Sequence, residues 1–181
     1  MISPAALDVI AFCAFGAMGQ TQRIAQVVVE TMAGVDREKT FAETLCMVAT
    51  ATARAAVSAY PSGDASRSHV SEVLLALPLT LHSYVAGREV LEKQQTSEEP
   101  APHDTADVER MLTFYQTQLG DAGFPDRKVL RHTMTLWMGR ISPRGLNEHP
   151  ETRLERLGLV DELSAHTRLI EAFTRNAIRT A

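Results

Sequence analysis

The segment VIAFCAFGAMGQTQRIAQVVV, residues 9–29, constrains the fold more than any other part of the chain. Its apolar part, residues 9–19, is 11 residues long, whereas a helix needs roughly 20 to cross a bilayer. Without a turn signal it continues into a polar helical stretch that carries Gln22, Arg23 and Gln26. We therefore expect a helix buried in protein over about residues 5–32, with a few polar groups at one end.

The rest of the chain repeats the helical pattern, and no stretch alternates for long as a strand would. Ser3 and Pro4 provide a start for the first helix, and Gly34 provides a stop. Pro78 lies inside the third helix and should kink it. The predicted helices after the first cover about 36–59, 68–94, 104–119, 126–141, 151–157 and 161–180. The predicted fold class is all-α, a single compact domain of about six to seven helices.

The spacing of apolar residues also predicts the buried faces. In the second helix the predicted face is Phe41, Leu45, Val48 and Ala55. In the third it is Val70, Val73, Leu74, Leu77, Leu81 and Tyr84. In the fifth it is Leu130, Met134, Trp137 and Ile141.

A chain of 181 residues has the size of one domain. The acidic, proline-rich segment at about 94–104 is predicted to be a flexible loop within a single domain, 1–181, because neither side holds enough helices for its own core. Cys13 and Cys46 lie in apolar helical patterns and are expected to be buried, reduced thiols. The first residues lack the basic region of a signal peptide, so we expect a cytoplasmic protein.

Charge is unevenly distributed around the net value of −4. Residues 125–181 hold 10 Lys and Arg against 7 Asp and Glu, whereas residues 1–124 hold 8 against 15. This asymmetry indicates either solvated helix faces or a basic surface for an acidic protein partner. In the second case the predicted contact residues are Arg127, Lys128, Arg131, Arg140 and Arg144. Neither balance is strong enough to indicate direct nucleic-acid binding.

The sequence lacks a phosphate-binding glycine loop, a serine nucleophile elbow and a Glu-x-x-His pair, so no catalytic, cofactor-binding or metal-binding residue is predicted. Glu162 and His166 share a helix face and are predicted to be a surface pair. Arg127 and His132 form an Arg-x4-His pattern that resembles the active motif of HEPN-class ribonucleases, although Lys128 departs from that motif. A HEPN-like ribonuclease and an ordinary charged helix face are the two alternatives for this pair.

Seven short segments, in order along nearly the whole chain, resemble the high frequency lysogenization protein HflD family of gammaproteobacteria. They are GAMGQTQRIAQ at 16–26, YPSGDASR at 60–67, LLAL at 74–77, REVLEK at 88–93, LW at 136–137, ISPRG at 141–145 and RLIEAFTRNAIRTA at 168–181. The chain departs from the family in stopping at residue 181, before that family's tryptophan and basic tail. The segment at 94–104 is also more acidic and proline-rich than the corresponding connection in the family.

The resemblance implies a non-enzymatic, all-helical regulator. The best-known member of that family binds and masks a transcription activator, phage lambda CII, and hinders its binding to DNA. The implied location is cytoplasmic, with peripheral attachment to the inner membrane. The expected partner is therefore a protein such as a transcription regulator, and no cofactor is implied. A helical subunit with a purely architectural role in a larger assembly is a further alternative.

Overall fold

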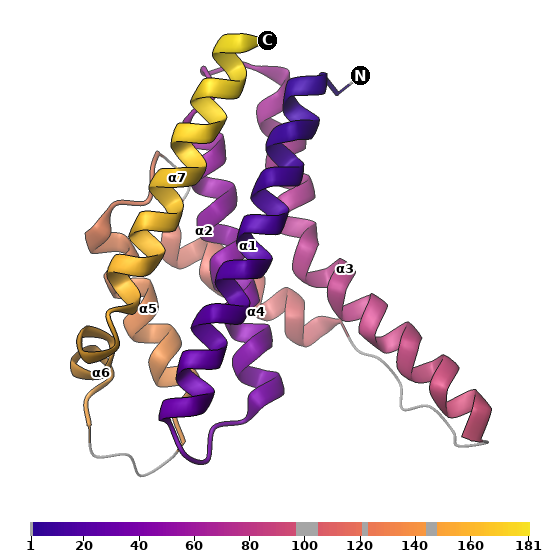
Figure 1. The fold of residues 1–181 in the computed structure, drawn as a ribbon, viewed down its shortest axis with the longest axis vertical. Helices are drawn as coiled ribbons and strands as arrows, with labels where there is room; N and C mark the ends of the chain where they lie inside the picture. The colour runs from indigo at the N-terminus through magenta and orange to yellow at the C-terminus, as the bar shows by residue number, and fades with distance from the viewer. Residues whose placement is uncertain (1, 97–104, 121–122, 144–147) are drawn as a thin grey trace.

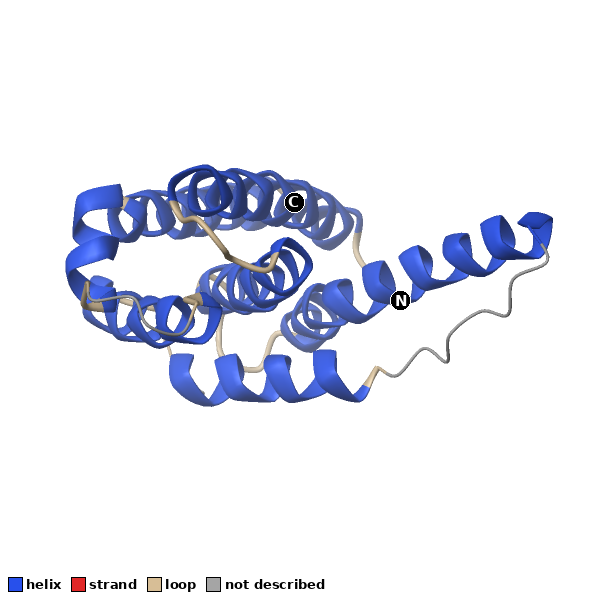
Figure 2. Ribbon diagram, turned by 90° about the horizontal axis from the view of Figure 1, so that it is seen from below, coloured by secondary structure: helices blue, strands red, loops and turns tan. Residues whose placement is uncertain are grey.

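The computed structural model describes residues 2–96, 105–120, 123–143 and 148–181, with the backbone alone for 86–96. These residues form helices and no strand, which confirms the all-α prediction (Figure 1). The helices pack into a single compact arrangement that Figure 2 shows from one end. In chain order they are α1 (Pro4–Thr31), α2 (Arg37–Ser58), α3 (Ala65–Thr96), α4 (Ala106–Leu119), α5 (Arg127–Ile141), α6 (Pro150–Leu157) and α7 (Leu159–Thr180).

The central helix is α2, which contacts α1, α3, α4, α5 and α7. Its residues from 43 to 53 are buried in succession, so it has no solvent-facing side over this length. Most of these residues are small, and small side chains allow neighbouring helices to approach from several directions. The buried threonine hydroxyls of Thr44, Thr50 and Thr52 each donate to the carbonyl oxygen one turn earlier, at 2.6–2.7 Å.

The sequence predicted that helix α1 would be enclosed by protein, but the helix is only half-buried. Its core face includes Val9, Cys13, Ile24 and Val28. Its other face carries the exposed residues Gln22, Arg23 and Gln26. Arg23 pairs with Glu162 of α7, and the Gln26 amide donates to Glu30 at 2.7 Å. The prediction was wrong because the less apolar α2 occupies the centre of the bundle.

Helix α3 begins at Ala65, before the predicted start at 68, and runs through Pro78. Its second half turns away from the bundle, as expected from a proline that removes a helical hydrogen bond (Figure 1). Val70 and Leu74 are buried as predicted, but Val73 is 43% and Tyr84 is 69% exposed. Val73 is adjacent to the buried Leu74 and therefore lies on the outward side of the packed part of α3, whereas Tyr84 lies in the second half, which turns away. These two predictions were therefore wrong.

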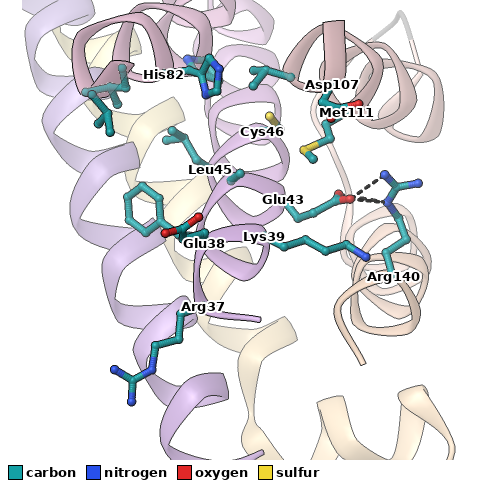
Figure 3. Close-up of a pocket in the computed structure, with 16 residues that line it drawn as sticks. Arg37, Glu38, Lys39, Glu43, Leu45, Cys46, His82, Asp107, Met111 and Arg140 are labelled. Carbon is teal, nitrogen blue, oxygen red and sulfur yellow. Dashed lines mark hydrogen bonds and ion pairs between the residues drawn. The ribbon is translucent and has the colours of Figure 1, made fainter. Parts of the chain in front are cut away.

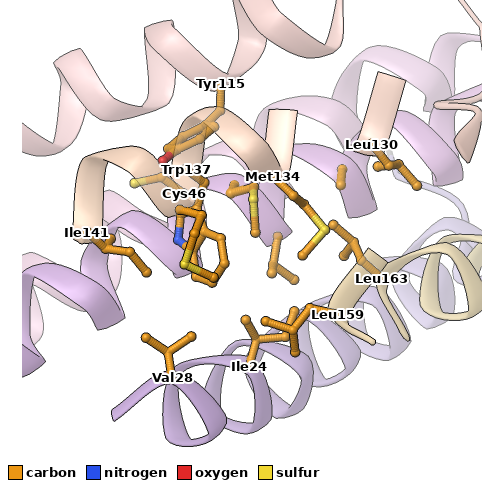
Figure 4. Packing of buried hydrophobic residues seen from close by; sticks show 14 of the residues in the cluster. Ile24, Val28, Cys46, Tyr115, Leu130, Met134, Trp137, Ile141, Leu159 and Leu163 are labelled. Atoms are coloured by element: carbon orange, nitrogen blue, oxygen red, sulfur yellow. The ribbon is translucent and has the colours of Figure 1, made fainter. Parts of the chain in front are cut away.

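The later helices begin and end within about two residues of their predicted limits. Asp126 caps α5, since its carboxylate accepts from the backbone N–H of Val129 at 2.9 Å. Thr105 occupies the position before α4 without a side-chain cap, and residue 104, where the predicted helix begins, lies outside the described residues. The predicted face of α5 is buried and meets residues of α1, α2, α4 and α7 in the main core (Figure 4).

Among the described residues, none of the helices has the length and apolarity required to span a bilayer. Cys13 and Cys46 are free and buried, as predicted. Burial raises the pKa of each thiol to about 12, so both stay protonated at neutral pH.

Helix α7 closes the bundle by lying antiparallel beside α1. The rings of Phe12 and Phe173 stack with their centroids 3.8 Å apart. One turn further along α1, an added Cβ at Gly16 would lie 3.3 Å from Cε1 of His166. Glycine at this position therefore gives the imidazole of α7 room to pass α1.

The imidazole of His166 is buried against α2, so the predicted surface pair of Glu162 and His166 is wrong. Its Nε2 lies 2.8 Å from Oγ1 of Thr52, whose own hydroxyl proton goes to the carbonyl of Val48. Thr52 can therefore only accept here, and the neutral ring donates through Nε2–H. Burial lowers the pKa of His166 from its ordinary 6.5 to about 4, so the ring is neutral at physiological pH.

This neutral histidine should make the fold less stable at acidic pH. Between pH 6.5 and pH 4 the unfolded state binds the imidazole proton and the folded state does not, so stability falls as the pH drops through this window. We expect His166 alone to lower the free energy of unfolding by about 3 kcal/mol between pH 7 and pH 4. Urea unfolding across this range should show that His166→Gln loses this dependence, whereas His132→Gln, on an exposed side chain, keeps it. Equal pH slopes for wild type and His166→Gln would contradict the assignment.

Candidate functional site

A groove of about 900 Å³ lies between α2, α3 and α4, with Arg140 of α5 at one side (Figure 3). Its wall is largely apolar and includes Phe41, Leu45, Pro78, Leu81, Val85, Val108 and Met111. Charged side chains stand at its edges: Arg37, Glu38, Lys39 and Asp107. An apolar wall with a few polar groups at the rim is typical of a binding site.

The groove exists where α3 diverges from α4. Pro78 lies on its wall, at the level where the second half of α3 leaves the bundle. Phe41 is exposed at the surface of α2, and Val85 is exposed on α3. Both side chains line the groove and not the core, so their apolar surface is available to a partner.

The fixed polar centre beside the groove is the carboxylate of Glu43, which is fully buried on α2. It accepts from the hydroxyl of Tyr115 at 2.6 Å and from Nε and Nη2 of Arg140 at 2.6–3.0 Å. The Arg140 guanidinium also lies 4.6 Å from the ring centroid of Phe114. One carboxylate thereby ties α2 to α4 and α5.

Glu43, Tyr115 and Arg140 form a hydrogen-bonded cluster that we call the clamp, and the pKa shifts of Tyr115 and Arg140 indicate a structural role. The hydrogen bond to Glu43 raises the pKa of Arg140, so the guanidinium stays charged. Burial raises the pKa of Tyr115, and the neighbouring Glu43 carboxylate raises it further, so the phenol stays protonated. Because the carboxylate of Glu43 is engaged by donors from two helices, it is positioned to hold the bundle together and not to transfer a proton.

The structure separates Arg140 from Arg127 and Arg131, three of the five basic residues that were predicted to form one contact surface. Arg127 pairs with Asp161 at 2.6 Å, and Arg131 pairs with Glu151 at 3.2 Å and with Glu155. These two lie together, at the junction of α5 with α6 and α7. Arg140 is held elsewhere, by Glu43 beside the groove.

The other two members of the predicted basic surface are Lys128 and Arg144. Lys128 is exposed, and Arg144 lies outside the described residues. The carboxylates beside Arg127, Arg131 and Arg140 offset much of the positive charge that the sequence suggested. The contact role of the five residues stays a prediction.

The pair predicted for ribonuclease activity is spread over α5. Arg127 is engaged with Asp161, and His132 is exposed five residues further along. Five residues correspond to about 140° around a helix, so the two side chains leave α5 in different directions. The structure adds no observation that favours the nuclease alternative. In addition, no group of three His, Cys, Asp or Glu side chains in the described part of the chain is arranged to hold a metal ion.

The groove and its buried carboxylate were not found by sequence reasoning. Glu43 lies three residues before Cys46 in a segment of small and apolar residues, and this isolation was a usable signal of a buried charge. Tyr115 lies in the predicted helix 104–119, but its pairing with Glu43 was not predicted. Comparisons with protein-family models, characterised proteins and solved structures gave no match for this chain.

Removing Arg140 should destabilise the protein because it leaves the buried Glu43 carboxylate without its cation. We expect Arg140→Met to lower the free energy of unfolding by about 3 kcal/mol, the lower end of the range for breaking a buried pair. Arg179→Met, on an exposed residue of the last turn of α7, is the control and should change it by less than about 0.5 kcal/mol. Adding Glu43→Gln to Arg140→Met should restore part of the loss, and chemical denaturation of the wild type, Glu43→Gln, Arg140→Met and the double variant would measure this coupling. A purely additive double variant would rule out the clamp.

Proposed function

We propose that this protein is a non-enzymatic, helical protein-binding regulator and that its groove receives an amphipathic helix of the partner. The observation that carries the proposal is the groove itself, a space of about 900 Å³ between three helices whose wall is largely apolar. Its charged groups are the side chains at the edges and the paired Glu43 and Arg140. Helix-in-groove binding uses this combination, because the apolar face of the incoming helix is buried while its polar face stays in water. The proposal agrees with what the resemblance to the HflD family implies.

The rim charges favour one orientation of the incoming helix. In Figure 3 Arg37, Glu38 and Lys39 lie toward the lower end of the groove, where they sum to one positive charge, and Asp107 lies at the upper end. Helix N-termini carry a partial positive charge and are commonly acidic in their first turn, whereas last turns are commonly basic. An incoming helix with its acidic first turn near Lys39 and its basic last turn near Asp107 therefore has complementary charges at both ends.

In this proposal the partner is a transcription regulator, and binding hides the surface that the regulator uses on DNA. The protein then needs no catalytic residue and no direct contact with nucleic acid. The proposed site of action is the cytoplasm, including the inner surface of the membrane, as the resemblance implies. The architectural alternative differs in requiring a permanent complex with a large apolar interface in place of reversible capture.

Affinity purification from the native host, followed by mass spectrometry, tests the proposal when it is done with paired variants. Leu81→Glu with Met111→Glu places charge on the groove wall and should abolish recovery of the partner, since apolar contacts at the centre of an interface carry most of the binding energy. Arg127→Glu with Arg131→Glu alters the basic residues at the α5–α6–α7 junction and should leave recovery unchanged.

The recovered regulator should then lose DNA binding in a gel-shift assay when the wild-type protein is added, and keep it with the groove variant. If the groove variant recovers the same partner and the basic variant does not, the contact surface is the one predicted from charge. RNA cleavage by the purified protein that disappears in His132→Ala would overturn the regulator proposal in favour of the nuclease.

A further inference from the structure

One line of residues along the outer face of α1 combines an exposed aromatic side chain with exposed small residues. Phe15 stands at its centre with 81% of its surface exposed. Ala11 and Gly19, one turn to either side, are exposed small residues, and Asp8 and Gln22 follow further out. Figure 1 shows α1 on the near side of the bundle with no helix in front of it. We call Asp8, Ala11, Phe15, Gly19 and Gln22 the outer stripe.

Gly19 is not explained by contacts within the chain. An added Cβ at Gly19 would meet nothing within 4 Å, whereas one at Gly16 would meet His166 at 3.3 Å. Glycine in the interior of a helix is less favourable than alanine because it loses more backbone freedom on folding. Gly16 is thus required by the packing of α7, while Gly19 leaves open space on the surface beside an exposed phenylalanine.

We propose that the outer stripe is the contact between two copies of this protein, with the two α1 helices antiparallel and crossing at Phe15. A two-fold axis at residue 15 places Ala11 of one copy opposite Gly19 of the other, and Asp8 opposite Gln22. The small residues let the two helix backbones approach, and both Phe15 rings are buried at the centre. The stripe is therefore complementary to itself, as a two-fold interface must be.

Charge selects the antiparallel arrangement over the parallel one. Asp8 is the only charged residue of the outer stripe. In a parallel pair the two Asp8 carboxylates would lie side by side, whereas in the antiparallel pair fourteen residues separate them, about 21 Å along the helix. The antiparallel pair also brings Asp8 to the Gln22 amide, which can donate to it.

The proposed contact is independent of the proposed function. The groove is lined by residues of α2, α3, α4 and α5, and none of the outer stripe lines it. Two copies joined through α1 therefore keep both grooves open, and the dimer can bind two partner helices. Self-association can be tested on the purified full chain without any knowledge of the partner.

Sedimentation equilibrium of the purified protein over a concentration series provides the first test. The wild type should associate to a dimer, and Phe15→Asp should raise the dissociation constant at least about 30-fold, the effect of losing an interface hot spot. Gly19→Gln should also dissociate the dimer. Because glutamine is the better helix former and the space is open, this variant should keep or raise the melting temperature of the monomer.

Tyr84→Asp is the matched control, on an exposed aromatic residue of α3, and should leave the mass of the dimer unchanged. A wild-type monomer at every concentration overturns the proposal. A dimer that survives Phe15→Asp and Gly19→Gln also overturns it, because another surface then holds the copies together.

Cysteine cross-linking under mild oxidation tests the direction of the helices, since both natural thiols are buried. An equimolar mixture of Ala11→Cys and Gly19→Cys should form a heterodimeric disulfide. Each variant alone should not, because residue 11 of one copy lies about 12 Å along the axis from residue 11 of the other, beyond the reach of a disulfide. Cross-linking of Ala11→Cys with itself, and none in the mixture, would show a parallel pair and overturn the antiparallel assignment.

Discussion

The carboxylate of Glu43 is the constraint on which the arrangement of the helices depends. It lies on the central helix with no access to water, where an unpaired charge would cost several kcal/mol. Tyr115 and Arg140 supply the compensating donors, and each comes from a different helix. The positions of α4 and α5 on α2 are thus fixed by hydrogen-bond geometry, which apolar packing alone would specify less sharply.

The groove follows from the same constraint combined with one proline. Glu43 holds α4 and α5 against α2, while Pro78 lets the second half of α3 depart from the bundle. Leu81 of α3 and Met111 of α4, which would otherwise be covered, then line an open space. The groove therefore lies beside the rigid hydrogen bonds of Glu43, and its wall is already formed before a partner binds.

Helical periodicity sufficed to predict the fold class, most helix limits and the core position of Trp137. It did not predict which helix is central, because burial of α2 depends on small Ala and Thr side chains that score as weakly apolar. It also misplaced Tyr84 and His166, whose exposure is decided by contacts with distant helices. The groove and the partner of Glu43 depend on tertiary placement of residues 72 and 97 positions apart, which local pattern does not encode.

The pairing of α1 with α7 has a consequence for the order of events during biosynthesis. The first and last helices lie side by side, joined by Phe12 with Phe173, by Gly16 with His166 and by Arg23 with Glu162. On the ribosome α1 emerges first, yet the helix that covers this flank is translated more than 120 residues later. At elongation rates of about 5–20 residues per second, the side of α1 that faces α7 stays uncovered on the nascent chain for several seconds or longer. Until α7 arrives, the side of α1 that faces it therefore lacks the contacts that Phe173, His166 and Glu162 supply.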